Sequence, residues 1–199
     1  MTTLVDIGIG NLHSARKAFE RFGPTTLTAD PDRIRRAERL VLPGDGAFPA
    51  CRHALAPLEE ALREAVARGA PLLGICVGMQ LLATKGHEFE EVEGLGYVPG
   101  EVVRIEAPGL KVPHMGWNDL VVTGNHPVLA DIATGDHAYF VHSWQMRVDD
   151  PADSLAHADH GGPVTAVVAR GNVVGAQFHP EKSQRAGLRL IENFLGWRP

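Results

Sequence analysis

The sequence predicts an α/β fold: a single domain over residues 1–199, with a mixed, largely parallel central sheet that helices flank. Three observations lead to this prediction. Short apolar runs alternate with amphipathic segments over residues 3–75, which is typical of parallel βαβ units. From Tyr97 the pattern changes to strands with shorter connections. No repeat, low-complexity run or long linker divides the chain, so one domain is the simplest interpretation.

The elements of the first half have clear local signals. Strands are predicted over residues 3–7, 25–29, 39–43 and 70–75, and helices over 12–22, a short stretch from Pro31, and 50–68. Gly23 and Pro24 end the first helix as a cap and a breaker. Asp30 and Pro31 are typical of a helix start, and Gly69 closes the long helix.

The second half is predicted to be richer in strands. These cover residues 100–106, 114–123, 138–148 and 164–178, and the last of them contains the turn signal "RGN", which indicates a hairpin. A closing helix is predicted over residues 184–197, because Leu188, Ile191, Phe194 and Leu195 recur with helical spacing.

Composition limits the classes of protein that the chain can belong to. Two cysteines, Cys51 and Cys76, do not make a disulfide framework and favour a reducing, cytoplasmic setting. The first residues lack the features of a signal or transit peptide. The longest apolar run is too short for a membrane span. With a net charge of -5 and no long basic run, no nucleic-acid partner is expected, and residues 33–39 are interpreted as a solvated helix face.

The run "GICVG" places a cysteine where a predicted strand becomes a helix. Such a joint strains the backbone, and flanking glycines such as Gly74 and Gly78 remove the Cβ atoms that would clash there. It also puts Cys76 at a helix start and leaves the N–H of Val77 free for an oxyanion. The alternative is a buried, inert cysteine, which is a common fate of this residue.

A cysteine nucleophile needs a base and a group that orients the base, and "FHPEKS" offers both. In extended backbone, His179 and Glu181 point to the same side, so the carboxylate can hold one ring nitrogen. Pro180 stiffens the link between them. Two alternatives remain: a surface histidine beside a solvated glutamate, and a zinc ligand pair. The second lacks a companion Cys/His cluster, so no metal or cofactor is expected.

The motifs "PGDGAF", "GICVGMQLL" and "FHPEKS", in this order, resemble the class I (triad) glutamine amidotransferase family. Within it, "DIGIGNLHSARKAF", "VPHMGWNDL" and "YFVHSW" are similar to the glutaminase subunits of imidazole glycerol phosphate synthase, an enzyme of histidine biosynthesis. The resemblance covers essentially the whole chain. It implies a flavodoxin-like amidotransferase fold.

The resemblance also implies roles for individual residues. Cys76 is the expected nucleophile, His179 the general base and then acid, and Glu181 the carboxylate that orients it. The backbone of Val77 and of the segment Gly44, Asp45 and Gly46 is expected to form the oxyanion hole. The family commonly has valine where this chain has Asp45, and a carboxylate facing the oxyanion would raise the barrier. We therefore expect Asp45 to point away from it.

Substrate contacts are implied as well. Gln80 is expected to hold the α-substituents of L-glutamine, helped by backbone groups of His142, Ser143 and Trp144. Glu88 lies where the family has its acidic partner for the substrate ammonium. Since the local sequence departs from the family there, Glu90 or Glu91 remains an alternative.

The family passes ammonia to a (β/α)8-barrel cyclase docked over the glutaminase mouth. This implies a heterodimer in which Trp117, Tyr139 and Trp144 are aromatic anchors, Lys182 a charged contact, and Asn11 a neighbour of the ammonia exit.

Two other functions are compatible with the sequence. One is a related cysteine hydrolase, or a glutaminase of another pathway, which a different partner would identify. The other is a catalytically silent regulatory protein, against which the complete Cys, His and Glu set argues.

Overall fold

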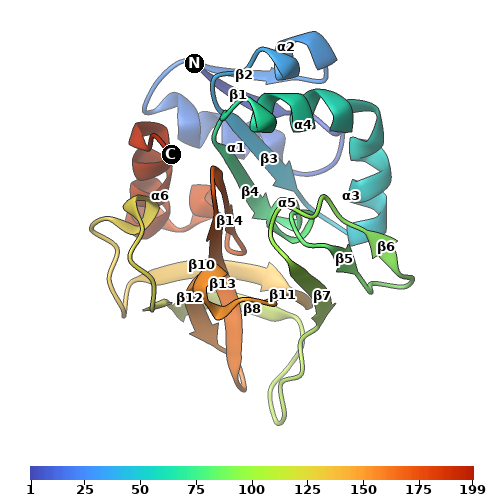
Figure 1. Ribbon diagram of the computed structural model, residues 1–199. Coiled ribbons are helices and arrows are strands. Elements are labelled where there is room, and N and C mark those ends of the chain that lie inside the picture. Colours follow the sequence, from blue (N-terminus) through green and yellow to red (C-terminus); the bar gives the residue numbers. More distant parts are fainter.

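The computed structural model describes residues 1–199, and its centre is an eight-stranded sheet (Figure 1). The strand order is β2-β1-β3-β4-β14-β13-β12-β9. These strands are β1 Thr2–Val5, β2 Thr25–Thr28, β3 Leu40–Gly44, β4 Leu72–Cys76, β9 Val121–Val122, β12 Ser154–Asp159, β13 Pro163–Arg170 and β14 Val173–Ala176. From β2 to β14 the pairing is parallel, and β13, β12 and β9 are added by antiparallel pairing. The predicted mixed sheet is confirmed.

Helices cover both faces of this sheet. They are α1 Leu12–Glu20, α2 Pro31–Arg35, α3 Phe48–Leu55, α4 Glu59–Ala67, α5 Val77–Gln80 and α6 Gln184–Gly196, with 3₁₀ turns at Ala56–Leu58, Pro127–Leu129, Pro151–Asp153 and Pro180–Lys182. Figure 1 shows α1 and α6 on one side and α3 and α4 on the other. None of these helices has the length and apolar character needed to cross a membrane.

Two smaller sheets lie beyond the carboxyl ends of β3 and β4 (Figure 1). Their strands are β5 Lys85–Gly86, β6 Val92–Glu93, β7 Gly100–Arg104, β8 His114–Asp119, β10 His137–His142 and β11 Trp144–Val148. One sheet has the order β11-β7-β5-β6. The other is the antiparallel pair β8–β10, called here the ribbon. The ligand-binding edge of the parallel sheet therefore faces these smaller sheets.

The prediction of one continuous helix over residues 50–68 is wrong. Pro57 interrupts it, because proline has no N–H to donate to the preceding turn. The chain passes instead through a 3₁₀ turn, so that α3 and α4 are separate helices. The apolar pattern concealed this break, since Leu55, Leu58 and Leu62 are all buried on either side of it.

Two predicted strands, over residues 114–123 and 138–148, are each divided between two sheets. Leu120 separates β8 from β9, and its N–H donates to the carbonyl of Asp136. Ser143 separates β10 from β11, and its carbonyl accepts from the N–H of Ile105. The predicted hairpin, in contrast, is confirmed by β13 and β14.

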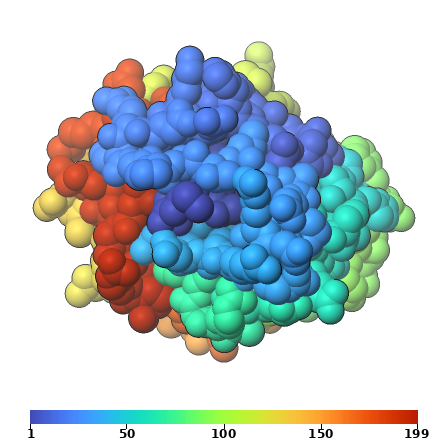
Figure 2. All heavy atoms as spheres, turned by 90° about the horizontal axis from the view of Figure 1, so that it is seen from above, coloured from blue at the N-terminus to red at the C-terminus, as the bar shows by residue number.

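The amino-terminal segments (blue) occupy the middle of the face seen from above, with α6 (red) along one side (Figure 2). Arg39, 8% exposed, joins the two regions, because its guanidinium donates to the carbonyls of Phe194 at 2.6 Å and Trp197 at 2.8 Å. A hollow of about 510 Å³ opens beside Met1 and is lined by Thr26, Asp30 and Arg33 among others. Cys76 does not line this hollow.

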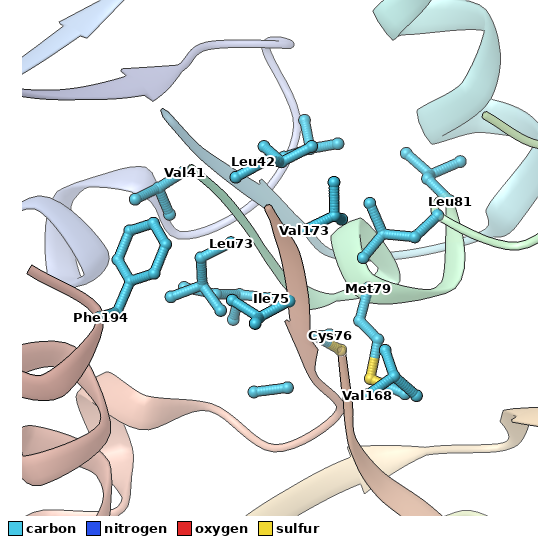
Figure 3. Close-up of a cluster of buried hydrophobic side chains, with 14 of the residues drawn as sticks. Val41, Leu42, Leu73, Ile75, Cys76, Met79, Leu81, Val168, Val173 and Phe194 are labelled. Carbon is cyan, nitrogen blue, oxygen red and sulfur yellow. The ribbon is translucent and has the colours of Figure 1, made fainter. Parts of the chain in front are cut away.

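The hydrophobic core extends along the central strands as far as Cys76. All five residues of β4 are buried, and Figure 3 shows Cys76 among Ile75, Met79 and Val168. Met79 reaches from α5 over Gly175 of β14, where a Cβ would lie 2.6 Å from the Met79 side chain. The lack of a side chain at Gly175 therefore lets α5 pack closely on the sheet.

Candidate active site

Cys76 occupies a strained joint between strand and helix. It is the last residue of β4, α5 follows at once, and its backbone has φ 56° and ψ -116°. Residues with a side chain rarely adopt positive φ, so this conformation persists only where the surrounding structure enforces it. The predicted sharp turn at the cysteine is confirmed. Because α5 is a single turn, however, its first N–H groups rather than a long helix dipole act on the sulfur.

Three glycines hold this joint in place. A Cβ on Gly78 would lie 1.8 Å from the carbonyl oxygen of Leu42 in β3. A Cβ on Gly74 would lie 2.5 Å from the carbonyl oxygen of Gly78, and one on Gly44 would lie 2.5 Å from the Gly78 nitrogen. These glycines let β3, β4 and α5 touch backbone to backbone, which fixes the position of Cys76.

His179 and Glu181 form a buried pair. The Nδ1 of His179 lies 2.8 Å from Oε1 of Glu181, and the two side chains are only 7% and 5% exposed. The predicted pairing is confirmed, but its cause differs from the predicted extended backbone. Pro180 begins a 3₁₀ turn, and this turn folds the carboxylate back onto the ring.

The other ring nitrogen of His179, Nε2, is buried and has no hydrogen-bond partner. Burial lowers the pKa of His179, but Cys76 and Glu181 outweigh this effect and raise that pKa to about 10. The negative charge of a Cys76 thiolate beside the ring favours its protonated form, although no hydrogen bond joins the sulfur to Nε2 in the structure. Nε2 is thus available to a bound substrate, next to the cysteine.

A pocket of about 280 Å³ opens over Cys76. It is lined by Asp45, Gly46, Cys76, Val77, Gln80, Glu88, Pro113, Val141, His142, Ser143 and Trp144. Nine of these are residues that the sequence predicted for the oxyanion hole, the substrate or the nucleophile. Pro113 and Val141 were not predicted, because their apolar side chains carry no polar signal, although Val141 directly precedes His142.

The acidic candidates for the substrate ammonium occupy different positions. Only Glu88 lines the pocket, and its Oε2 accepts from the N–H of Phe48 at 2.7 Å. Glu91 instead contacts Lys85 at 3.2 Å, and Glu90 is exposed. The geometry therefore favours Glu88.

Gln177 is a site residue that the sequence analysis missed. It is fully buried, its Nε2 lies 3.8 Å from the Sγ of Cys76, and its Oε1 accepts from Nε2 of Gln80 at 3.0 Å. Gln80 also donates to the carbonyl of Trp144 at 2.9 Å. The signal that would have found Gln177 is its place two residues before His179, directly after β14.

The predicted oxyanion segment lies beside the nucleophile. Gly44 pairs with Cys76 across β3 and β4, and the N–H of Val77 begins α5, where no intrahelical acceptor exists. The N–H of Gly46 is already engaged, because the Asp45 carboxylate accepts from it at 2.9 Å. Asp45 is exposed. A Cβ added to Gly10 would lie 3.1 Å from the Cβ of Asp45, so the two segments are close together.

Among the predicted interface residues, Trp144 lines the pocket, and the others fall into two groups. Trp117 and Tyr139 lie edge to face on the ribbon with ring centroids 6.0 Å apart, and the Nζ of Lys182 lies 5.8 Å from the Tyr139 ring centroid. Trp117 is 50% exposed. Asn11 lies elsewhere: it caps α1 and borders a small cavity together with His179 and Glu181.

Comparison with known proteins agrees with this geometry. The model of the family described as "Glutamine amidotransferase class-I" matches residues 3–196. The chain is 59% identical to the imidazole glycerol phosphate synthase subunits HisH of Ruegeria pomeroyi and Cereibacter sphaeroides, over 100% of each chain. It is 51% identical to that of Rhodopseudomonas palustris, over 98% of each chain.

The fold is similar to solved structures of amidotransferases. One, described as a glutamine amidotransferase, has a TM-score of 0.77 at 22% identity and covers 98% of this chain and 97% of that one. Another, a putative GMP synthase subunit from Thermoplasma acidophilum, has a TM-score of 0.73 at 19% identity, covering 98% and 92%. The family match over nearly the whole sequence, together with the relatives of high identity, shows that the chain belongs to the class I glutamine amidotransferases.

Proposed function

We propose that this protein hydrolyses L-glutamine to glutamate and ammonia through a cysteine thioester, as the glutaminase subunit of an imidazole glycerol phosphate synthase. One observation carries the chemistry: a His179 ring held by Glu181 offers a free Nε2 beside a cysteine on a strained joint, at the floor of a pocket. The relatives that match over the full length are named as subunits of that synthase.

The first half of the reaction forms the thioester. The Cys76 thiolate attacks the side-chain amide carbon of glutamine, and the carbonyl oxygen becomes an oxyanion that faces the N–H of Val77. The protonated His179 then gives its Nε2 proton to the departing nitrogen. Ammonia leaves as the C–N bond breaks, and the glutamyl group stays on sulfur. The raised pKa of His179 keeps this proton in place at neutral pH.

The second half hydrolyses the thioester. His179, now neutral, accepts a proton at Nε2 from a water molecule that attacks the thioester carbonyl. When the C–S bond breaks, the thiolate and the protonated ring are restored. The released side-chain carboxylic acid ionises to glutamate. Glu181 remains hydrogen-bonded to Nδ1 throughout and stabilises the imidazolium, without itself taking the proton.

Substrate binding is assigned to the walls of the pocket. The free oxygen of Glu88 is placed to pair with the substrate ammonium, because its other oxygen is fixed by Phe48 at the start of α3. Gln80 and the backbone at Ser143 and Trp144 complete the site for the α-substituents.

The ammonia is proposed to pass to a (β/α)8-barrel cyclase that makes imidazole glycerol phosphate and AICAR in histidine biosynthesis. The half-exposed Trp117, the partly buried Tyr139 and Lys182 are proposed to provide an aromatic and cationic surface for this partner. Asn11, beside His179 and Glu181, lies on the route by which ammonia would leave.

A reconstitution experiment tests the proposal. The protein is mixed with the cyclase subunit of the same organism, and glutamate release from glutamine is measured with and without the cyclase's own ligand. We expect release in the complex and its loss in Cys76→Ala. Cys51→Ser is the matched control, because the Cys51 thiol donates to the carbonyl of Asp45 at 3.2 Å and a hydroxyl keeps that donor, so the activity should remain. Undiminished hydrolysis by Cys76→Ala would overturn the assignment.

A further inference from the structure

Two buried histidines have side chains that take no part in the proposed reaction; His142 borders the pocket, and His114 does not line it. His114 on β8 and His142 on β10 face each other across the ribbon, and they are only 3% and 7% exposed. The His114 ring is stacked between Phe140, at a centroid distance of 4.5 Å, and His160, at 4.3 Å. Buried polar rings of this kind need hydrogen-bond partners, and both have them.

The hydrogen bonds of this pair run in one direction. His142 Nδ1 lies 2.8 Å from the carbonyl oxygen of Trp144, which only accepts, so Nδ1 carries the proton. In the neutral ring Nε2 is then an acceptor, and His114 Nδ1 donates to it at 3.2 Å. His114 Nε2 accepts in turn from the amide nitrogen of Asn118 at 3.0 Å. The order Asn118, His114, His142, Trp144 carbonyl is called here the histidine chain.

Both rings must be neutral for this order to hold. Burial lowers the pKa of His114 to about 4, with a smaller contribution from His160. Burial also lowers the pKa of His142 to about 3, although its bond to the Trp144 carbonyl acts in the opposite direction. At neutral pH each ring therefore has one donor and one acceptor, as the chain requires.

The histidine chain ends on the backbone that borders the catalytic pocket. The Trp144 carbonyl accepts from His142 and also from Gln80, and Gln80 continues to Gln177, whose amide reaches the Sγ of Cys76. The peptide of Trp144 is thus fixed from two sides. The carbonyl of the neighbouring Ser143 accepts from the N–H of Ile105, so the backbone of residues 143 and 144, which line the pocket, is held at both carbonyls.

We propose that His114 and His142 are positioning residues for glutamine binding, because their directed hydrogen bonds hold the Ser143–Trp144 backbone in the orientation that receives the substrate. This inference rests on the proposed function. It assigns the outer face of the ribbon, with Trp117 and Tyr139, to the partner, and its inner face to substrate alignment.

The tautomers provide the first test. In long-range ¹H–¹⁵N spectra of the ¹⁵N-labelled protein at pH 7, both His114 and His142 are expected as the Nδ1–H form, assigned through single His→Gln variants. Observation of the Nε2–H form, or of a charged ring, at either residue would overturn the directed chain.

The second test separates binding from chemistry. A glutamine-like alkylating analogue, diazo-oxo-norleucine, is used to label Cys76 in the complex with cyclase, and KI and kinact are measured for each variant. His114→Phe keeps an aromatic ring between Phe140 and His160 but can neither accept nor donate. We expect its KI to rise about tenfold or more, with kinact within about threefold of the wild type.

Three further variants complete the design. His114→Gln retains a donor and an acceptor and should return KI toward the wild-type value. His160→Gln is the matched control, since it changes the stacking on His114 but lies outside the chain, and its KI should be unchanged. Asn118→Leu removes the first donor and should raise KI even if His114→Phe fails to fold.

The outcomes distinguish this inference from the proposed function. If the wild type is not labelled at all, the proposed function fails. If the wild type is labelled and His114→Phe or Asn118→Leu has an unchanged KI, the positioning role is refuted and the histidines serve the fold alone.

Discussion

Gly78→Ala should disrupt the joint that carries the nucleophile. The added Cβ would lie 1.8 Å from the carbonyl oxygen of Leu42, whereas Cβ atoms keep at least 3.0 Å from such neighbours. The backbones of α5 and β3 would have to separate by the difference, 3.0 minus 1.8, or 1.2 Å. Backbone cannot move aside as a flexible side chain can. We therefore expect the free energy of unfolding to fall by about 3–5 kcal/mol, which is at or above the usual cost of overpacking.

Urea and thermal unfolding measure this loss, and labelling of Cys76 by the glutamine analogue measures the site. For a chain of this size the melting temperature should fall by about 6–20 °C. Gly23→Ala is the control, because no atom lies within 4 Å of its added Cβ and its φ is not positive. If Gly78→Ala unfolds within about 1 kcal/mol of the wild type and labels normally, the backbone contact does not have the role described here.

Three further predictions follow from buried groups. The kcat of glutamine hydrolysis should decline as pH rises through the raised His179 pKa near 10, and Glu181→Gln, which lowers that pKa, should move the decline to lower pH. Mass spectrometry after brief iodoacetamide treatment at pH 8 should find Cys76 alkylated and not Cys51, since burial raises the Cys51 pKa to about 11. Arg39→Met leaves two carbonyls at the end of α6 without donors and should lower the free energy of unfolding by about 2–5 kcal/mol, as urea titration measures.

Local signals account for the parts of the site that were predicted from the sequence. The glycine spacing around Cys76 is a property of five consecutive residues, and His179 and Glu181 are two residues apart. In each case the constraint and the functional group belong to the same short segment. The strained turn and the buried pair therefore followed from the sequence alone, although the 3₁₀ turn at Pro180 did not.

What could not be predicted depends on contacts between distant segments. Gln177 and Gln80 are joined by a hydrogen bond across 97 residues, and neither residue signals the other. The division of the predicted strand at Leu120 is likewise decided by which neighbours β8 and β9 find, not by their own apolar pattern. The hydrogen bond from the Gly46 N–H to the Asp45 carboxylate depends on the rotamer of Asp45, and the sequence allows several rotamers.

Because Gly44, Gly74 and Gly78 meet mainly through main-chain atoms, the backbone position of Cys76 depends on these contacts more than on the volumes of the neighbouring side chains. Aliphatic residues around this crossing can be exchanged during evolution, at some cost in stability, without moving the nucleophile. Three glycines thus determine where the nucleophile lies, and substitutions in the surrounding core have little effect on that position. If the core is redesigned and these three glycines are kept, Cys76 should therefore remain in the same position.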